Sequence, residues 1–174
     1  MEMGTTGRTA RRDFDVLVAD DDTGVRELLA DFLAEKGLSV ASTPDGRAAV
    51  TAIERAGSRC RLVFTDIAMP GADGFAVLSA ARLANPSCYV VMITGYGSLE
   101  TAISAVRLGA QDYLTKPFSL GQVDVILRKA NALAKAEQGE PMSGGAVAVA
   151  LNAIETRLGA MEAQLREMAQ RFGR

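Results

Sequence analysis

The sequence predicts an α/β fold with a doubly wound, five-stranded parallel sheet, followed by a separate C-terminal helix of the coiled-coil type. Three observations lead to this prediction. Five short apolar runs alternate with longer segments of helical periodicity, most of the runs lack polar alternation, and a heptad pattern occupies the end of the chain. Continuous Val, Leu and Ile runs suit strands covered on both faces, as they are in a parallel sheet.

The apolar runs give the strands in order, at 16–19, 38–41, 62–65, 89–94 and, more weakly, 112–115. Helical spacing of apolar residues predicts connecting helices at 23–36, 45–56, 75–83, 99–108 and 119–136. Gly37 follows the first helix in the position where a left-handed residue ends a helix. Ser119 and Gln122 have the spacing of a capping box at the start of the last one.

These strand–helix units occupy residues 14–137, which we expect to form one domain with its own core. Residues 1–13 are rich in Gly, Thr and Arg without periodicity, and are expected to form a mobile arm. Residues 138–145 contain three Gly and one Pro, which predicts a flexible linker. An amphipathic helix is predicted over 146–174.

That final helix carries apolar residues at alternating spacings of four and three. They are Val147, Leu151, Ile154, Leu158, Met161, Leu165, Met168 and Phe172. This a/d heptad pattern predicts self-association, most simply as a dimer. Leu at a with Ile or Met at d also permits higher orders, and a helix packed back on the 14–137 domain is the alternative.

Composition narrows the function classes. The chain has 19 Lys and Arg against 21 Asp and Glu without a local basic patch, so we expect neither nucleic acid nor a membrane as partner. No stretch approaches the roughly 20 apolar residues of a membrane span. Two cysteines without a Cys-x-x-Cys motif, and no signal-like segment, predict reduced thiols and a cytoplasmic location. The absence of histidine excludes Ser-His and Cys-His catalysis on this chain.

Polar side chains stand at the carboxyl ends of four predicted strands, where open parallel sheets bind their ligands. These residues are Asp20 and Asp21, Asp66, Thr94 and Lys116. Carboxylates in one crevice repel one another unless a hard cation such as Mg²⁺ neutralises them. A metal held by carboxylates, beside an amine and a hydroxyl, is suited to phosphoryl transfer. Asp66 would be the nucleophile, whereas Asp22 is expected to cap the first helix.

Four motifs in this order resemble the receiver domain of two-component response regulators. They are VLVADDD at 16–22, TDIAMPGADG at 65–74, MITGYG at 92–97 and DYLTKPF at 112–118. The resemblance covers about 14–136 and implies a flavodoxin-like (βα)5 fold. Residues 94–118 look most like receivers of the nitrogen-regulation type, which usually precede an ATPase domain. We expect no ATPase or DNA-binding output domain in the residues that follow 137.

The resemblance also implies roles for the site residues. A sensor histidine kinase would phosphorylate Asp66, with Mg²⁺ as the cofactor. The implied metal ligands are Asp20, Asp21, Asp66 and the backbone carbonyl of Ala68. Thr94 would be the switch hydroxyl and Lys116 the phosphate-sensing amine, preceding a cis peptide to Pro117. Tyr113 matches the switch aromatic, although a half-buried edge-strand Tyr without that role is an equal alternative. Such a domain is a phosphoacceptor that assists its own phosphorylation and dephosphorylation, and not an independent metabolic enzyme.

Two other function classes stay open. A strand followed by Asp20-x-Asp22 superficially matches phosphohydrolases of the haloacid dehalogenase type, which use an Asp nucleophile. That family has Thr or Val where this chain has Gly24, and it needs a downstream acidic pair that we do not find. A scaffold independent of phosphorylation is disfavoured because every expected site residue is present. Under the leading hypothesis, the chain signals by contact with a protein target.

Overall fold

Within residues 14–95 and 99–137, which the computed structural model describes, five parallel strands alternate with five α-helices. The strands are β1 (Val16–Ala19), β2 (Val40–Thr43), β3 (Leu62–Asp66), β4 (Tyr89–Thr94) and β5 (Asp112–Thr115). The helices are α1 (Thr23–Glu35), α2 (Gly46–Ala56), α3 (Gly74–Ala84), α4 (Leu99–Arg107) and α5 (Leu120–Glu137), with a short 3₁₀ helix, η1 (Gly57–Arg59), after α2. The sheet order β2-β1-β3-β4-β5 confirms the predicted doubly wound fold.

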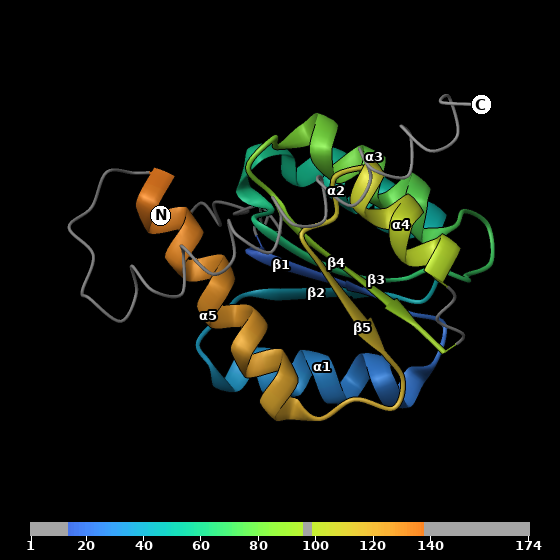
Figure 1. Cartoon of the computed structure of the whole chain (residues 1–174). Coiled ribbons are helices and arrows are strands. Elements are labelled where there is room, and N and C mark those ends of the chain that lie inside the picture. The colour runs from blue at the N-terminus through green and yellow to red at the C-terminus, as the bar shows by residue number, and fades with distance from the viewer. Residues whose placement is uncertain (1–13, 96–98, 138–174) are drawn as a thin grey trace, which may run out of the picture.

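Helices cover both faces of the sheet, with α1 and α5 on one side and α2, α3 and α4 on the other (Figure 1). The central strands β1, β3 and β4 are buried along their whole length, whereas the edge strands β2 and β5 are partly exposed. Alternate residues of the central strands contribute to two hydrophobic cores, one on each face of the sheet. Leu17 and Val63 pack toward α2 and α3, and Val18 and Phe64 pack toward α1 and α5. Burial on both faces explains the unbroken apolar sequence of the central strands.

β2 begins two residues later than the predicted 38–41, and this placement was wrong. Leu38 belongs to the end of α1. Its N–H donates to the Leu33 carbonyl at 3.2 Å, and the N–H of Gly37, whose φ is 82°, donates to the Ala34 carbonyl at 2.9 Å. This pair of bonds is the Schellman ending of a helix, which places an apolar residue just after the glycine. The prediction took that residue for the start of the strand.

The other predicted helices and strands agree with the structure to within one residue at each end, although η1 was not predicted. The capping box is confirmed, because the Ser119 N–H donates to Gln122 Oε1 at 2.8 Å and the Gln122 N–H reaches Ser119 Oγ at 3.4 Å. In residues 14–95 and 99–137, no helix combines the length and the apolar character needed to cross a bilayer. The predicted arm, linker and C-terminal helix lie outside the described residues.

An ion-pair network joins α5 to α1. Lys36 Nζ lies 2.7 Å from Asp124 Oδ1, and Arg128 pairs with the other oxygen of the same carboxylate. The hydrogen bond from Lys36, and then that from Arg128, lowers the pKa of Asp124. The charged carboxylate therefore contributes stability above its unfolded pKa of about 3.9, and this contribution is lost as the pH falls through the lowered, folded-state pKa.

Asp124→Asn is therefore expected to lower the midpoint of thermal unfolding modestly at neutral pH, and to leave it unchanged once the pH lies below the lowered folded-state pKa, where the unmodified carboxylate is also neutral. Parallel thermal melts of the two proteins across this pH range measure the difference. A deficit that is the same at every pH would show that the ion pairs do not stabilise the fold.

Candidate functional site

An acidic cluster lies at the carboxyl ends of β1 and β3. Asp20, Asp21 and Asp66 each offer one carboxylate oxygen, and these three oxygens lie within 4.8 Å of one another. Asp20 is fully buried and Asp66 is 6% exposed, whereas Asp21 is open to solvent. Because β1 and β3 are parallel neighbours, their ends bring together acids that are far apart in the sequence.

The ammonium of Lys116 also lies at this cluster. Lys116 directly follows the edge strand β5. Its Nζ lies 3.0 Å from Asp66 Oδ2, 3.0 Å from Asp20 Oδ1 and 2.8 Å from Asp20 Oδ2. The Lys116–Pro117 peptide is cis, as predicted, and the Lys116 N–H donates to the Thr94 carbonyl at 2.8 Å. This backbone bond fixes where the lysine leaves the edge of the sheet.

Burial and charge act in opposite directions on these groups. Burial raises the pKa of Asp20, although hydrogen bonds from Lys116 and from the Asp22 amide work against it. Burial also acts to lower the pKa of Lys116, but its hydrogen bonds to Asp20 and Asp66 outweigh this effect, and its pKa is raised. Lys116 is therefore protonated at neutral pH. One ammonium against three carboxylates leaves an excess of negative charge.

The residues of the cluster fit a hard divalent cation. Asp20 Oδ2 is buried, and among the residues that the structure describes its charged partner is Lys116, whose Nζ lies 2.8 Å away. An all-oxygen set of carboxylates is what Mg²⁺ and Ca²⁺ prefer. Ala68 lies in the loop after Asp66, where its N–H donates to Asp66 Oδ1 at 3.4 Å.

Arg26 of α1 is a neighbour of the cluster that the sequence analysis did not predict. Its guanidinium donates to the Asp20 carbonyl at 2.8 Å and to the Asp21 carbonyl at 3.5 Å, and so holds the backbone of the acidic pair. An arginine in the second turn of an amphipathic helix gives no sequence signal of this role. Asp22, by contrast, caps α1 as predicted, by accepting the N–H groups of Gly24 and Val25 at 2.8 and 3.1 Å.

The two predicted switch residues lie on β4 and β5. Thr94 ends β4 and is 6% exposed, at the same edge of the sheet as Asp66. Tyr113 lies in β5 and is half-buried, with its hydroxyl 3.2 Å from Thr101 Oγ1 of α4. Tyr113 therefore links the edge strand to α4.

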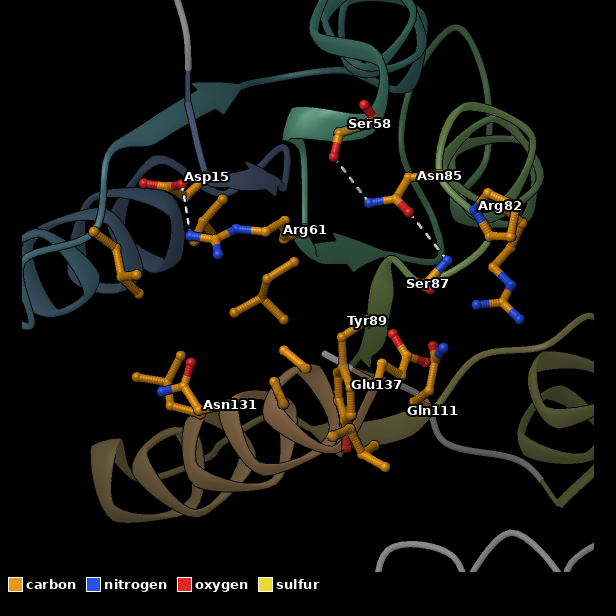
Figure 2. A pocket seen from close by; sticks show the side chains of 18 residues that line it. Asp15, Ser58, Arg61, Arg82, Asn85, Ser87, Tyr89, Gln111, Asn131 and Glu137 are labelled. Atoms are coloured by element: carbon orange, nitrogen blue, oxygen red, sulfur yellow. Dashed lines mark hydrogen bonds and ion pairs between the residues drawn. The ribbon is translucent and has the colours of Figure 1, made fainter. Parts of the chain in front are cut away.

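A cavity of about 290 Å³ lies at the opposite edge of the sheet (Figure 2). Its walls include Val16, Leu62 and Tyr89, the first residues of β1, β3 and β4, together with Leu127 and Leu133 of α5. Since the acidic cluster lies at the other ends of these strands, the cavity is not part of the candidate site.

Comparison with known proteins agrees with this geometry. The response regulator receiver domain family matches residues 16–128. The chain belongs to this receiver family. It is therefore a phosphoacceptor module of two-component signalling and not a metabolic enzyme, and its sheet order and acidic pocket are those of a receiver.

Individual relatives support the assignment. The nitrogen assimilation regulatory protein NtrX of Azorhizobium caulinodans is 36% identical over 118 residues, which are 67% of this chain and 26% of that protein. The receiver domain of NtrX from Brucella abortus is 39% identical with a TM-score of 0.59, over 67% of this chain and 97% of that one. This receiver chain thus spans about a quarter of the length of the Azorhizobium relative.

A third relative was solved in a modified state. It is a response regulator protein from Burkholderia pseudomallei with a phosphorylated aspartic acid, a calcium ion and citrate. It is 25% identical to this receiver, with a TM-score of 0.61, over 72% of this chain and 73% of that one.

Gly74, the first residue of α3, lies against the strand end that carries Asp66. A Cβ at this position would lie 2.2 Å from the Asp66 carbonyl oxygen and 3.0 Å from Ile67 Cα. Gly74→Ala is therefore expected to lower the free energy of unfolding by about 1–3 kcal/mol through overpacking. Urea denaturation measures the change. Gly121→Ala is the control, because its Cβ would meet nothing closer than 3.7 Å and alanine favours a helix, so equal destabilisation of both variants would contradict this explanation.

Proposed function

We propose that this receiver accepts a phosphoryl group on Asp66 from a sensor histidine kinase, with Mg²⁺ as cofactor. The observation that carries the proposal is the meeting of three carboxylates and one ammonium at a single sheet edge. The metal ligands in this proposal are Asp20, Asp21, Asp66 and the backbone carbonyl of Ala68. The phosphorylated aspartic acid and calcium ion of the Burkholderia relative support the same chemistry on this fold.

In the reaction, a carboxylate oxygen of Asp66 attacks the phosphorus atom of the donor. An acyl phosphate bond forms while the bond between phosphorus and the histidine nitrogen of the kinase breaks. Lys116 already contacts Asp66 at 3.0 Å and can transfer one of its hydrogen bonds to a phosphoryl oxygen. The Thr94 hydroxyl binds a second oxygen. Mg²⁺, when bound, neutralises the charge of the carboxylates and the incoming phosphoryl group.

Phosphorylation then changes the α4–β5 face. The phosphoryl group adds about −1.5 to −2 charges, and Thr94 and Lys116 move to meet them. Lys116 is tied to Thr94 through the backbone, and Tyr113 of the adjacent strand is bonded to Thr101 of α4. Movement at Thr94 is thereby passed to the surface around Tyr113, which acts as the switch aromatic.

The output, in this proposal, is a protein contact. The heptad residues between 147 and 172 pair with the same helix of a second copy, most simply in a dimer, and this assembly or the switched α4–β5 face docks a target protein. The regular spacing of the eight apolar positions supports this part of the proposal, and they lie outside the described residues.

Asp66→Asn tests the phosphorylation site. With a small acyl phosphate donor and Mg²⁺, the unmodified chain is expected to gain one phosphoryl group by intact mass, and Asp66→Asn none, because the nucleophile is gone. Asp22→Asn is the matched control, because its side chain caps α1 and asparagine caps equally well, so it should be phosphorylated normally. Phosphorylation of Asp66→Asn would disprove the assignment. Donor turnover without mass gain in the unmodified chain would indicate a phosphohydrolase, and no reaction a scaffold.

Thr94→Ala tests the switch. The variant should still be phosphorylated on Asp66 but should lose most of the response around Tyr113 and α4, since the hydroxyl that follows the phosphoryl group is absent. A coupling of about 1–3 kcal/mol corresponds to a population change of roughly 5- to 150-fold. Amide chemical shifts with and without the phosphodonor report the response. A full response in Thr94→Ala would show that the signal does not pass through Thr94.

The predicted C-terminal helix is tested by sedimentation. The full chain is expected to be an oligomer whether or not Asp66 is phosphorylated, because 26 helical residues would span about 39 Å and such a helix needs its apolar stripe covered. A truncation that ends at Gln138 should be monomeric when unphosphorylated. A monomeric full chain, or an unphosphorylated truncation that dimerises equally well, would refute the role of this helix.

A further inference from the structure

The loop that joins β3 to α3, residues 67–73, lies against the first turn of α2. A Cβ on Gly46, the first residue of α2, would lie 1.9 Å from the Ala72 carbonyl oxygen and 2.6 Å from the Ala72 carbonyl carbon. The Gly46 N–H also donates to the Pro70 carbonyl at 3.3 Å. Backbone therefore contacts backbone here, and only glycine allows this approach, because any side chain would force one segment to move.

Gly71 of the loop also lies close to the start of α2. Gly71 has a φ of 83°, and a Cβ added to it would lie 3.6 Å from Arg47 Cβ and 3.7 Å from Asp45 Oδ1. The Ala72 N–H donates to the Pro70 carbonyl at 3.0 Å, which folds the loop into a tight turn across the helix. Residues 70–72 are thus seated on the start of α2.

The other end of the loop is fixed to β3. The Gly74 N–H donates to the Ile67 carbonyl at 3.0 Å, and the Ile67 N–H donates to the Ile93 carbonyl of β4 at 2.9 Å. Ala68 therefore lies in a short segment that is held by β3 and β4 on one side and by α2 on the other. If the loop loses its contact with α2, residues 68–72 are free to shift while Asp66 stays in its strand.

We infer that Gly46 is a positioning residue for the metal site. By letting α2 hold the 67–73 loop, it keeps the Ala68 carbonyl in place beside the carboxylates of Asp20, Asp21 and Asp66. This inference rests on the proposed function, because Ala68 is a ligand only if the cation binds at this cluster.

A substitution at Gly46 is expected to weaken Mg²⁺ binding by more than a loss of stability alone would. The three atoms nearest to a Cβ on Gly46 all belong to Ala72, and none belongs to a carboxylate of the cluster. A substitution at Gly46 thus acts where α2 meets the loop and does not directly touch the acidic groups on β1 and β3. Mg²⁺ affinity should fall in part, whereas loss of a carboxylate ligand in Asp21→Ala should abolish binding.

Calorimetric titration of the full chain with Mg²⁺ tests this. Gly46→Ala is expected to bind Mg²⁺ about 10- to 100-fold more weakly than the unmodified chain, the range typical of changes just outside a metal's ligands. Gly37→Ala is the matched control. It strains a residue with a φ of 82° at the end of α1 and meets no atom within 4 Å, so it should lose stability but keep its Mg²⁺ affinity.

Hydrogen exchange of the metal-free chain supplies a readout independent of the cation. In the unmodified chain, the amides of residues 46 and 72 both donate to the Pro70 carbonyl. These two amides should exchange faster in Gly46→Ala than in Gly37→Ala when the two variants are compared at equal global stability. Unchanged Mg²⁺ affinity in a folded Gly46→Ala would overturn the inference. Should Gly46→Ala fail to fold, Gly71→Ala strains the same loop at a residue whose φ is 83°, and unchanged affinity in that variant overturns the inference equally.

Two outcomes concern the proposed function itself. If the unmodified chain binds no Mg²⁺, or if Asp21→Ala binds it as tightly as the unmodified chain, the cation does not occupy this cluster. The metal part of the proposed function then fails together with the inference. Normal binding by the unmodified chain, with equal binding by Gly46→Ala, removes only the role of Gly46.

Discussion

The contact of Lys116 with Asp20 and Asp66 is the interaction on which the site depends. A buried carboxylate such as Asp20 loses much of its hydration, and a second acid nearby adds repulsion. The ammonium, 3.0 Å or less from both side chains, offsets part of this cost. The residual negative charge of three carboxylates against one ammonium makes the cluster receptive to a cation.

The parallel sheet makes this contact possible. β1, β3 and β4 are neighbours in the centre of the sheet, and their carboxyl ends lie at the same edge, so the residues at or just after these ends are brought together. Helices on both faces leave that edge as the accessible place for polar groups, while the strand interiors supply two apolar cores. The acidic groups of the cluster are therefore carried at the ends of buried central strands.

The sequence predicted much of this because the signals were local. Unbroken apolar runs marked the buried strands, and Asp20, Asp21, Asp66 and Lys116 stood directly after them, so the sheet rule alone brought them together. β2 was misplaced because an edge strand has a weaker apolar signal and Leu38 completes the end of α1.

Contacts between distant backbones could not be predicted in this way. Arg26 binds the carbonyls of Asp20 and Asp21, and Gly46 meets the backbone of Ala72, but neither contact leaves a periodic pattern. A carbonyl is present in every residue, so its partner is known only once the chain has folded. The roles of Thr94 and Tyr113 came from family resemblance, and the structure gives their positions.

Lys116 lies near the end of the domain and its two carboxylate partners lie 96 and 50 residues earlier. A nascent chain that has emerged from the ribosome only as far as β4 holds both acids without their ammonium. The acids acquire their charge partner only when β5, the last strand in the sequence, joins the edge of the sheet beside β4. The charge balance of the cluster is therefore complete only in a chain that has been synthesised through β5 and has that strand in the sheet, and a chain that ends earlier or frays at β5 lacks it.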